Sequence, residues 1–320
     1  MTRFRVLLGA AALATLGLPL VLSTSQLSVF LLVCLATVVG CGLTLLVGFA
    51  GQVSLGHAAF YAIGAYTAAL LARDLQVPPL LALAAAPLSS GVAGLLVGWP
   101  LLRLRGHALS FGTLAFQLIS LSVLSQAKDI TGGDIGLVGI PALGAGPLAF
   151  TGPEKSLAFA YVGWTLAALA VACTLSLTRS RVGRALRALA TSEIGATASG
   201  VSVRHLKLQV FTLSAAFAGV AGAIFAFYVG YVAPGSFPLL LSVQFLIMVT
   251  VGGWGSALGA PVGACIVLVS MQALVALGTQ TGMPRGAPVI FSYALYAVAL
   301  IAVLRLRPRG VVAGIAGARR

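Results

Sequence analysis

Residues 28–48, SVFLLVCLATVVGCGLTLLVG, contain no charged side chain. An α-helix rises 1.5 Å per residue, so about 20 such residues cross the roughly 30 Å hydrocarbon core of a bilayer. Similar apolar runs recur along the chain. The ten runs lie near residues 6–22, 28–48, 54–72, 79–102, 108–125, 157–178, 208–232, 237–253, 259–279 and 287–304. The pattern predicts an all-α fold, a polytopic transmembrane helical bundle of about ten spans.

The composition excludes an ordinary water-soluble domain. Of 320 residues, 60% are hydrophobic and only 8% are charged, against about a quarter charged in soluble proteins. Ten spans would occupy roughly 200 residues, so we expect a single transmembrane domain over residues 1–320. The first run follows Arg3 and Arg5 and also has features of a signal peptide, but it lacks a clear cleavage site, and we expect a retained helix.

The basic residues indicate the orientation of the chain. With ten spans, fifteen of the 19 Lys and Arg residues fall on one side, and only Arg73, Lys128, Lys155 and Arg285 fall on the other. Cytoplasmic loops carry the excess of positive charge, so both termini are expected in the cytoplasm. The basic residues behind the formal net charge of +14 are spread between the apolar runs. This spread indicates that they set the orientation of the spans and do not form a nucleic-acid binding surface.

Several kinds of chemistry are missing from the sequence. All five acidic residues fall in predicted loops, whereas proton-coupled transporters usually carry an ionisable group within a span. The G-x-x-x-x-G-K-[ST] loop that cradles nucleotide phosphates is absent. The cysteines and histidines have neither metal-ligand nor catalytic spacing. We therefore expect no enzymatic activity, no metal site and no cofactor, and an energy source outside this chain.

Polar side chains inside the predicted spans or at their ends are candidates for a solute pathway, because such groups are costly in hydrocarbon. The candidates are Gln52, Ser54, His57, Thr113, Gln117 and Gln244. None is charged at neutral pH, which suits a neutral or zwitterionic solute. For His57, polar packing between helices is an equally open interpretation.

Small residues spaced four apart allow helices to approach closely. We assign this packing role to Gly94 with Gly98, Gly219 with Ala215, Gly222 with Ala218, and Gly259 with Gly263.

The basic segment at residues 179–207 is predicted to contain two short helices. Arg184 and Arg187 share one face of the first, opposite Leu186 and Leu189. Ser192 can cap the second, Glu193 suits its positive N-terminal end and Gly200 can end it. A helix this short is only marginally stable in water. We therefore expect a cytoplasmic partner to stabilise it. A plain basic loop that only sets topology is the alternative.

Five stretches resemble one family, the permease subunits of branched-chain amino acid ABC transporters. They are GFAGQVSLGHAAFYAIGAYTAALL from Gly48, TGGDIGL from Thr131, SRVGRALRAL from Ser180, LSAAFAGVAGAIFA from Leu213 and LIMVTVGGWGSALGAPVGA from Leu246. They occur in the family's order from about residue 30 to 305, and they look more like the M-type than the H-type subunit. The chain departs from the family at Gln244, where an acidic residue is frequent, and at Gly195, where alanine is usual.

The resemblance implies an importer subunit in the bacterial inner membrane. Its partners would be a second, related permease, two cytoplasmic ATPase subunits that use the ATP, and a periplasmic solute-binding protein. Residues 179–207 would be the coupling element that docks on the ATPase. The long outer loop at residues 126–156 would receive the binding protein or serve only as a connector. Three alternatives stay open: a permease for another small solute such as urea or short amides, a self-sufficient channel or facilitator, and a membrane-embedded enzyme.

Overall fold

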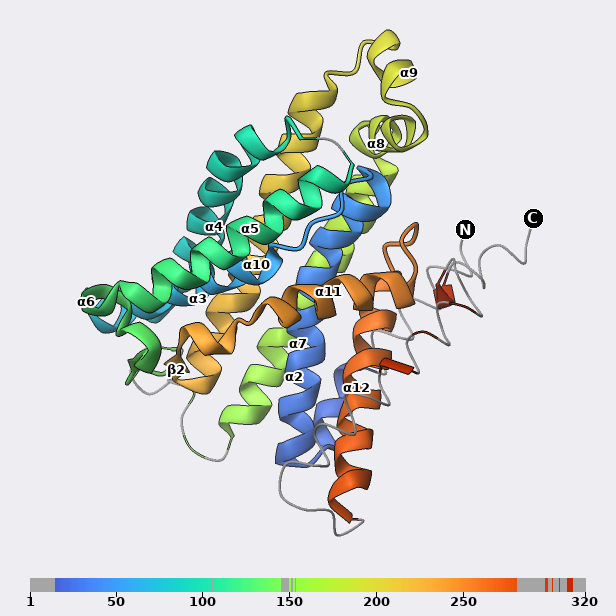
Figure 1. The fold of residues 1–320 in the computed structure, drawn as a ribbon. Coiled ribbons are helices and arrows are strands. Elements are labelled where there is room, and N and C mark those ends of the chain that lie inside the picture. The colour runs from blue at the N-terminus through green and yellow to red at the C-terminus, as the bar shows by residue number, and fades with distance from the viewer. Residues whose placement is uncertain are drawn as a thin grey trace.

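The computed structural model describes residues 15–104, 106–144, 150, 152, 154–280, 297, 298, 301, 305 and 310–312. In this part of the chain the protein is a bundle of helices with one small pair of strands (Figure 1). The main helices are α2 (Thr24–Leu43), α3 (His57–Arg73), α4 (Pro79–Leu101), α5 (His107–Gln126), α7 (Lys155–Arg179), α8 (Arg181–Thr191), α9 (Glu193–Ala198), α10 (Val203–Val229), α11 (Leu239–Gly252) and α12 (Gly259–Gln280). The shorter elements are η1 (Leu18–Leu20), η2 (Thr44–Phe49), α6 (Lys128–Thr131), η3 (Gly133–Ile135), β1 (Leu137–Val138), β2 (Tyr231–Val232) and η5 (Pro234–Ser236).

The helical membrane bundle expected from the sequence is confirmed. Seven of the described helices are long and apolar enough to cross a membrane. An eighth predicted span corresponds to α3, which has 17 residues and is largely buried by its neighbours. The predicted spans at 6–22 and 287–304 fall largely outside the described residues, as do both termini.

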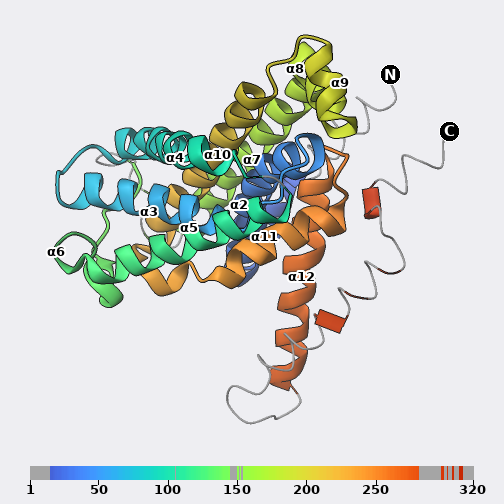
Figure 2. The same ribbon diagram turned by 45° about the horizontal axis from the view of Figure 1, so that its top comes forward.

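The bundle has two distinct ends. Helices α8 and α9 lie at one end, and α6 with the β1–β2 pair lies at the other (Figures 1 and 2). Helices α7 and α10 run between these ends, because α7 leads into α8 and α10 leads from α9 to β2. We refer to them as the α8–α9 end and the strand-pair end.

Helix α10 packs against α2, α3 and α4, and glycines bring the backbones together. A Cβ atom at Gly222 would lie 1.9 Å from the Tyr61 carbonyl oxygen of α3, and one at Gly219 would lie 2.3 Å from Ser90 Oγ of α4. On the α4 side, a Cβ atom at Gly94 would meet Ala215 Cβ at 2.6 Å, and one at Gly98 would meet the Phe211 ring at 2.9 Å. Any larger side chain here would force these helices apart.

Glycines also allow the backbone of α12 to approach that of α11 closely. A Cβ atom at Gly263 would lie 1.8 Å from the Met248 carbonyl oxygen of α11. One at Gly259, where α12 begins, would lie 2.4 Å from the Gly253 carbonyl oxygen.

Part of the 126–156 loop is tied to the bundle. Strand β1 pairs antiparallel with β2, with Leu137 opposite Val232 and Val138 opposite Tyr231. The Tyr231 hydroxyl also donates to the Ile135 carbonyl oxygen at 2.8 Å. The described first half of this loop is therefore fixed to the end of α10 rather than extending freely from α5.

Candidate functional site: a buried polar cluster and a projecting helix pair

The helical path is interrupted inside the bundle between η2 and α3, at residues 50–56. A non-helical segment leaves backbone groups unpaired, which is tolerated at membrane depth only where protein or water satisfies them. Side chains from α5 and α11 bond to backbone groups here, and Ser214 of α10 bonds to the His57 ring. This buried polar cluster comprises Ser54, His57, Thr113, Gln117, Ser214 and Ser242, each less than 2% exposed.

His57, the first residue of α3, joins the interrupted segment to α10. Its Nδ1 lies 3.2 Å from Ser54 Oγ and its Nε2 lies 2.7 Å from Ser214 Oγ. A neutral imidazole can donate from one nitrogen and accept at the other, so both contacts are hydrogen bonds. The ring is fully enclosed, and it also stands edge-on to Phe60 with centroids 6.0 Å apart.

Two hydroxyl groups satisfy the free N–H groups around the start of α3. Thr113 Oγ1 of α5 accepts from the Leu55 N–H at 2.9 Å, and Ser242 Oγ of α11 accepts from the Ala58 N–H at 2.8 Å. The first N–H groups of any helix lack an intrahelical partner. Here the caps come from distant parts of the chain, so the position of α3 depends on α5 and α11.

The three glutamines predicted to line a pathway occupy different surroundings. Gln117 belongs to the cluster, since its Oε1 accepts from Ser242 at 3.4 Å and its Nε2 donates to the Phe237 carbonyl oxygen at 3.1 Å. Gln52 lies in the interrupted segment, and its buried Oε1 has no hydrogen-bond partner among the described residues. Gln244 lies apart from the cluster, with its Nε2 3.6 Å from Met271 Sδ of α12.

Sequence reasoning missed Ser214 and Ser242, which complete the cluster. Both are single small hydroxyl residues within long apolar helices. Such residues commonly bond to their own helix, so the sequence carries no sign that these two bond to α3 instead. Only the folded arrangement brings them to His57 and Ala58.

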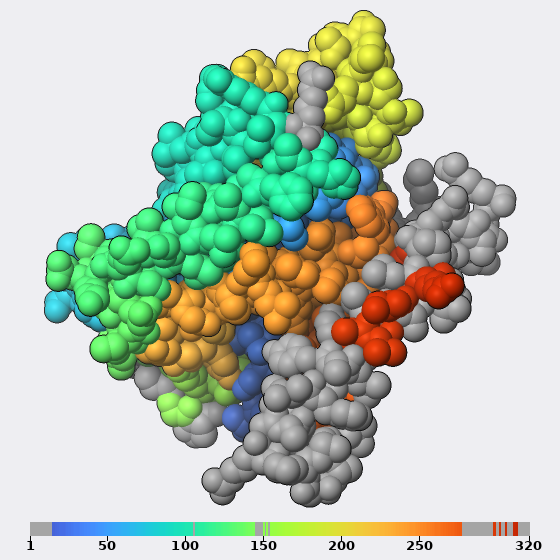
Figure 3. Space-filling view, in the orientation of Figure 1, coloured from blue at the N-terminus to red at the C-terminus, as the bar shows by residue number. Residues whose placement is uncertain are grey.

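The helix pair α8–α9 forms the second candidate site, and it projects from the bundle (Figure 3). Ser180 Oγ accepts from the Gly183 N–H at 3.4 Å at the start of α8, and Ser192 Oγ accepts from the Gly195 N–H at 3.1 Å at the start of α9. Gly200, just beyond α9, has φ of +80°, a conformation that favours glycine. The pair is therefore shaped by its own local caps.

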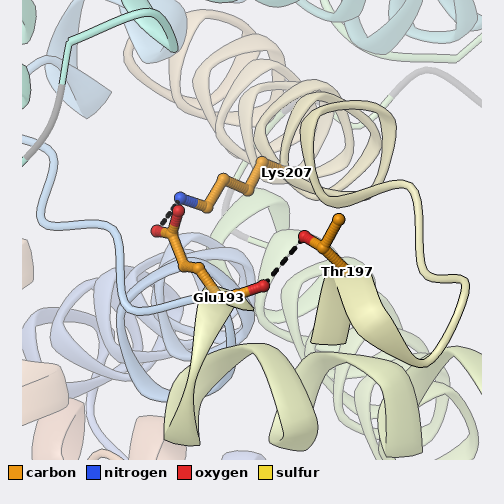
Figure 4. A network of polar contacts seen from close by, with 3 residues as sticks. All are labelled: Glu193, Thr197 and Lys207. Carbon is orange, nitrogen blue, oxygen red and sulfur yellow. Dashed lines mark hydrogen bonds and ion pairs between the residues drawn. The ribbon is translucent and has the colours of Figure 1, made fainter. Parts of the chain in front are cut away.

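The projecting pair is nevertheless fastened to the spans that flank it. Leu186 and Leu189 of α8 are buried, and α8 contacts both α7 and η2. Arg187 Nη1 donates to the Thr178 carbonyl oxygen of α7 at 2.8 Å, while Arg184 is exposed. Glu193 of α9 forms an ion pair with Lys207 of α10 (Figure 4). A force on α8–α9 would therefore reach both α7 and α10.

The tip of the pair presents an apolar side chain to solvent. Ile194 is 85% exposed and stands beside Glu193 and Thr197 in a shallow surface hollow. Thr197 Oγ1 donates to the Glu193 carbonyl oxygen at 2.9 Å, which stiffens this single turn (Figure 4).

The fold defines a multi-pass helical membrane protein with a helix pair that projects from the bundle at one end. Residues 25–304 match the family described as branched-chain amino acid transport system / permease component. The chain belongs to this family of ABC transporter permeases.

Its relatives agree with this assignment. The chain is 34% identical over 288 residues to the high-affinity branched-chain amino acid transport system permease protein LivM of Escherichia coli, covering 84% of this chain and 68% of that protein. It is 28% identical to the permease protein BraD of Pseudomonas aeruginosa, covering 85% and 89%. It is 26% identical to the permease protein LivH of Salmonella typhimurium, also covering 85% and 89%. No solved structure matches the chain.

Proposed function

We propose that this chain is the membrane-spanning permease subunit of an importer for branched-chain or related neutral, apolar amino acids. Two separate cytoplasmic ATPase subunits drive it, a second related permease completes the pathway, and a periplasmic binding protein delivers the solute. The LivM, BraD and LivH relatives are named as branched-chain amino acid permeases, which supports the amino-acid substrate. The absence of a nucleotide-binding loop from the sequence supports an external source of ATP hydrolysis.

The observation that carries the proposal is the firmly attached α8–α9 pair with exposed Ile194 at its tip. In our account the ATPase subunits grip this pair. Their closure on ATP moves α8–α9, and the contacts of Arg187 with α7 and of Glu193 with α10 pass the movement into the bundle. Helix α10 carries Ser214, so the movement reaches His57 and the interrupted segment.

The buried polar cluster is proposed to form part of the gate along the solute pathway. Its uncharged groups suit a zwitterionic solute, and Gln52 has a buried acceptor that is free in the described part of the chain. The cluster is enclosed in this conformation. A pathway beside it therefore requires α3 to move relative to α10, which is the movement that the coupling pair would impose.

We further propose that the α8–α9 end faces the cytoplasm of a bacterial inner membrane, with ten spans and both termini inside. The eight described spans alternate in direction between the two ends, and segments 102–104 and 179–207 carry seven described basic residues at the α8–α9 end. The strand-pair end carries Arg73, Lys128 and Lys155. This asymmetry follows the excess of positive charge in cytoplasmic loops.

Uptake by reconstituted vesicles tests the function. The complete transporter, with its binding protein and ATP, should accumulate labelled leucine or valine against a gradient, and it should not accumulate urea or acetamide. Vesicles that contain both permeases without the ATPase should accumulate neither. Uptake without the ATPase would support the self-sufficient channel, and preference for urea or acetamide would support the alternative substrate class.

A single substitution tests the docking surface. Replacing Ile194 with serine should weaken ATPase binding by roughly 10- to 100-fold, because burial of an isoleucine side chain contributes about 1.5–3 kcal/mol. Ile135 is similarly exposed, at 78%, but lies at the strand-pair end, so Ile135→Ser is the matched control. Equal ATPase affinity of the two variants would exclude Ile194 from the contact.

A further inference from the structure

Helix α4 exposes a continuous apolar stripe that ends in a tryptophan. Leu88, Val92, Leu96 and Trp99 follow one another at helical spacing and are each about half or more exposed, with Trp99 at 49%. No described helix covers this stripe, so in a bilayer that holds this chain alone it lies against the acyl chains. Tryptophan is enriched where hydrocarbon meets the headgroups, so Trp99 marks that boundary at the α8–α9 end.

Two arginines stand at this boundary. The Arg204 guanidinium, in the first turn of α10, lies 4.5 Å from the centre of the Trp99 ring. A guanidinium stacked on an aromatic face keeps the N–H groups at its edge available for a phosphate. Arg103 follows Trp99 by four residues and is also exposed. Neither arginine forms an ion pair or donates a side-chain hydrogen bond within the described residues.

The positive charge here is not balanced by the protein. Segments 102–104 and 179–207 contain seven described basic residues and a single acidic residue, Glu193. That carboxylate is already paired with Lys207. Arg103 and Arg204 are therefore free, within the described residues, to bind an anion from outside these segments.

We propose that Trp99, Arg103 and Arg204 form a binding site for the headgroup phosphate of an anionic phospholipid. The two arginines hold the phosphate, the indole ring lies at the glycerol level, and one acyl chain lies along the α4 stripe. A protein partner is the less favoured occupant because the site continues directly into an exposed apolar stripe. The α8–α9 pair, by contrast, projects farther from the bundle (Figure 3).

Quenching of tryptophan fluorescence tests the site in the full chain. The chain has three tryptophans, so Trp164→Phe and Trp254→Phe leave Trp99 as the only one. This protein is placed in phosphatidylcholine nanodiscs that contain a small fraction of lipid brominated high on the acyl chain, either phosphatidylglycerol or phosphatidylcholine. Brominated phosphatidylglycerol should occupy the site roughly 30-fold more than brominated phosphatidylcholine, since each of the two basic residues near an anionic surface contributes about 1 kcal/mol.

The variants separate charge from structure. Arg204→Gln and Arg103→Gln should each reduce the preference to about fivefold, because one arginine remains. Arg204→Lys keeps the charge but loses the planar group stacked on Trp99, and should keep more of the preference than Arg204→Gln does. Lys128→Gln, which removes one exposed charge at the strand-pair end, should leave it unchanged.

Four results would overturn the proposal: no preference in the parent protein, a full preference in Arg204→Gln, loss of the preference on adding millimolar inorganic phosphate, or displacement of the brominated lipid by added ATPase subunits. The third result would indicate a site for a soluble anion, and the fourth would indicate a protein contact.

Discussion

The path of the long helices is interrupted at two contrasting places, by the non-helical residues 50–56 inside the bundle and by the short helices α8 and α9 at its end. At the first, the free N–H groups near α3 are capped by Thr113 and Ser242 from other helices. At the second, Ser180 and Ser192 cap their own helices. One interruption depends on tertiary contacts and the other on local sequence.

The difference follows from the surroundings of each segment. Backbone groups at the α8–α9 end can bond to water if a cap is lost, whereas those around α3 have no such replacement. The interior segment is therefore predicted to be sensitive to small changes, and the projecting pair is predicted to tolerate them. The substitutions below test this contrast, and their effects are expected to decrease in the order given.

The largest effect is expected from His57→Leu. This change removes both hydrogen bonds of the ring and leaves the hydroxyls of Ser54 and Ser214 buried without that partner. The expected loss in the free energy of unfolding is about 2–3 kcal/mol, measured by detergent-induced unfolding. His107→Leu, at the exposed start of α5, is the control and should change stability little. Similar losses of stability in both variants would show that the hydrogen bonds of His57 contribute no more than an exposed histidine does.

Replacing glycine with alanine should change the free energy of unfolding differently at Gly56 and at Gly195. A Cβ atom at Gly56 would lie 2.7 Å from the Thr113 carbonyl oxygen, so Gly56→Ala should cost about 1–2 kcal/mol. At Gly195 in α9 the nearest atoms are Ser192 Cβ and Oγ at 3.5 Å, and alanine favours the helix. Gly195→Ala should therefore be neutral or slightly stabilising. Destabilisation of the same size at both sites would contradict the contrast.

The same serine-to-alanine change can be made in both caps. Ser242→Ala should cost about 1–2 kcal/mol, because the Ala58 N–H is then left unpaired in the interior. Ser192→Ala should cost about 0.5 kcal/mol, because water can replace the hydroxyl at the exposed Gly195 N–H. Unfolding midpoints of the two variants provide the test, and a larger loss for Ser192→Ala would reverse the interpretation.

Local features of this contrast were predictable from the sequence. Eight of the ten apolar runs coincide with described helices, since a run of about 20 apolar residues has few other ways to satisfy its backbone in a membrane. The two short helices within residues 180–200 were also predictable, because a capping residue such as Ser192 and a terminating residue such as Gly200 act on backbone groups only a few residues away.

Long-range features were not predictable in this way. Ser214 lies 157 residues from His57, and Ser242 lies 184 residues from Ala58, so no local pattern links them. Lys207 was counted only as one of many basic residues, and its pairing with Glu193 depends on how α9 folds back towards α10. The pairing of β1 with β2 likewise joins two strands of two residues each, which are too short to leave a recognisable alternation.

The most direct test of the central claim is the number of solute molecules transported per ATP hydrolysed by the complete transporter carrying Glu193→Ala. The Glu193–Lys207 ion pair is partly exposed, and such a pair contributes about 1 kcal/mol or less to stability, so the variant should still fold. Loss of the link between α9 and α10 is predicted to lower this ratio severalfold. Asp74→Ala, which breaks the Arg73 ion pair at the strand-pair end, should leave the ratio unchanged. A normal ratio in Glu193→Ala would contradict the proposal that α8–α9 transmits the force of ATP hydrolysis.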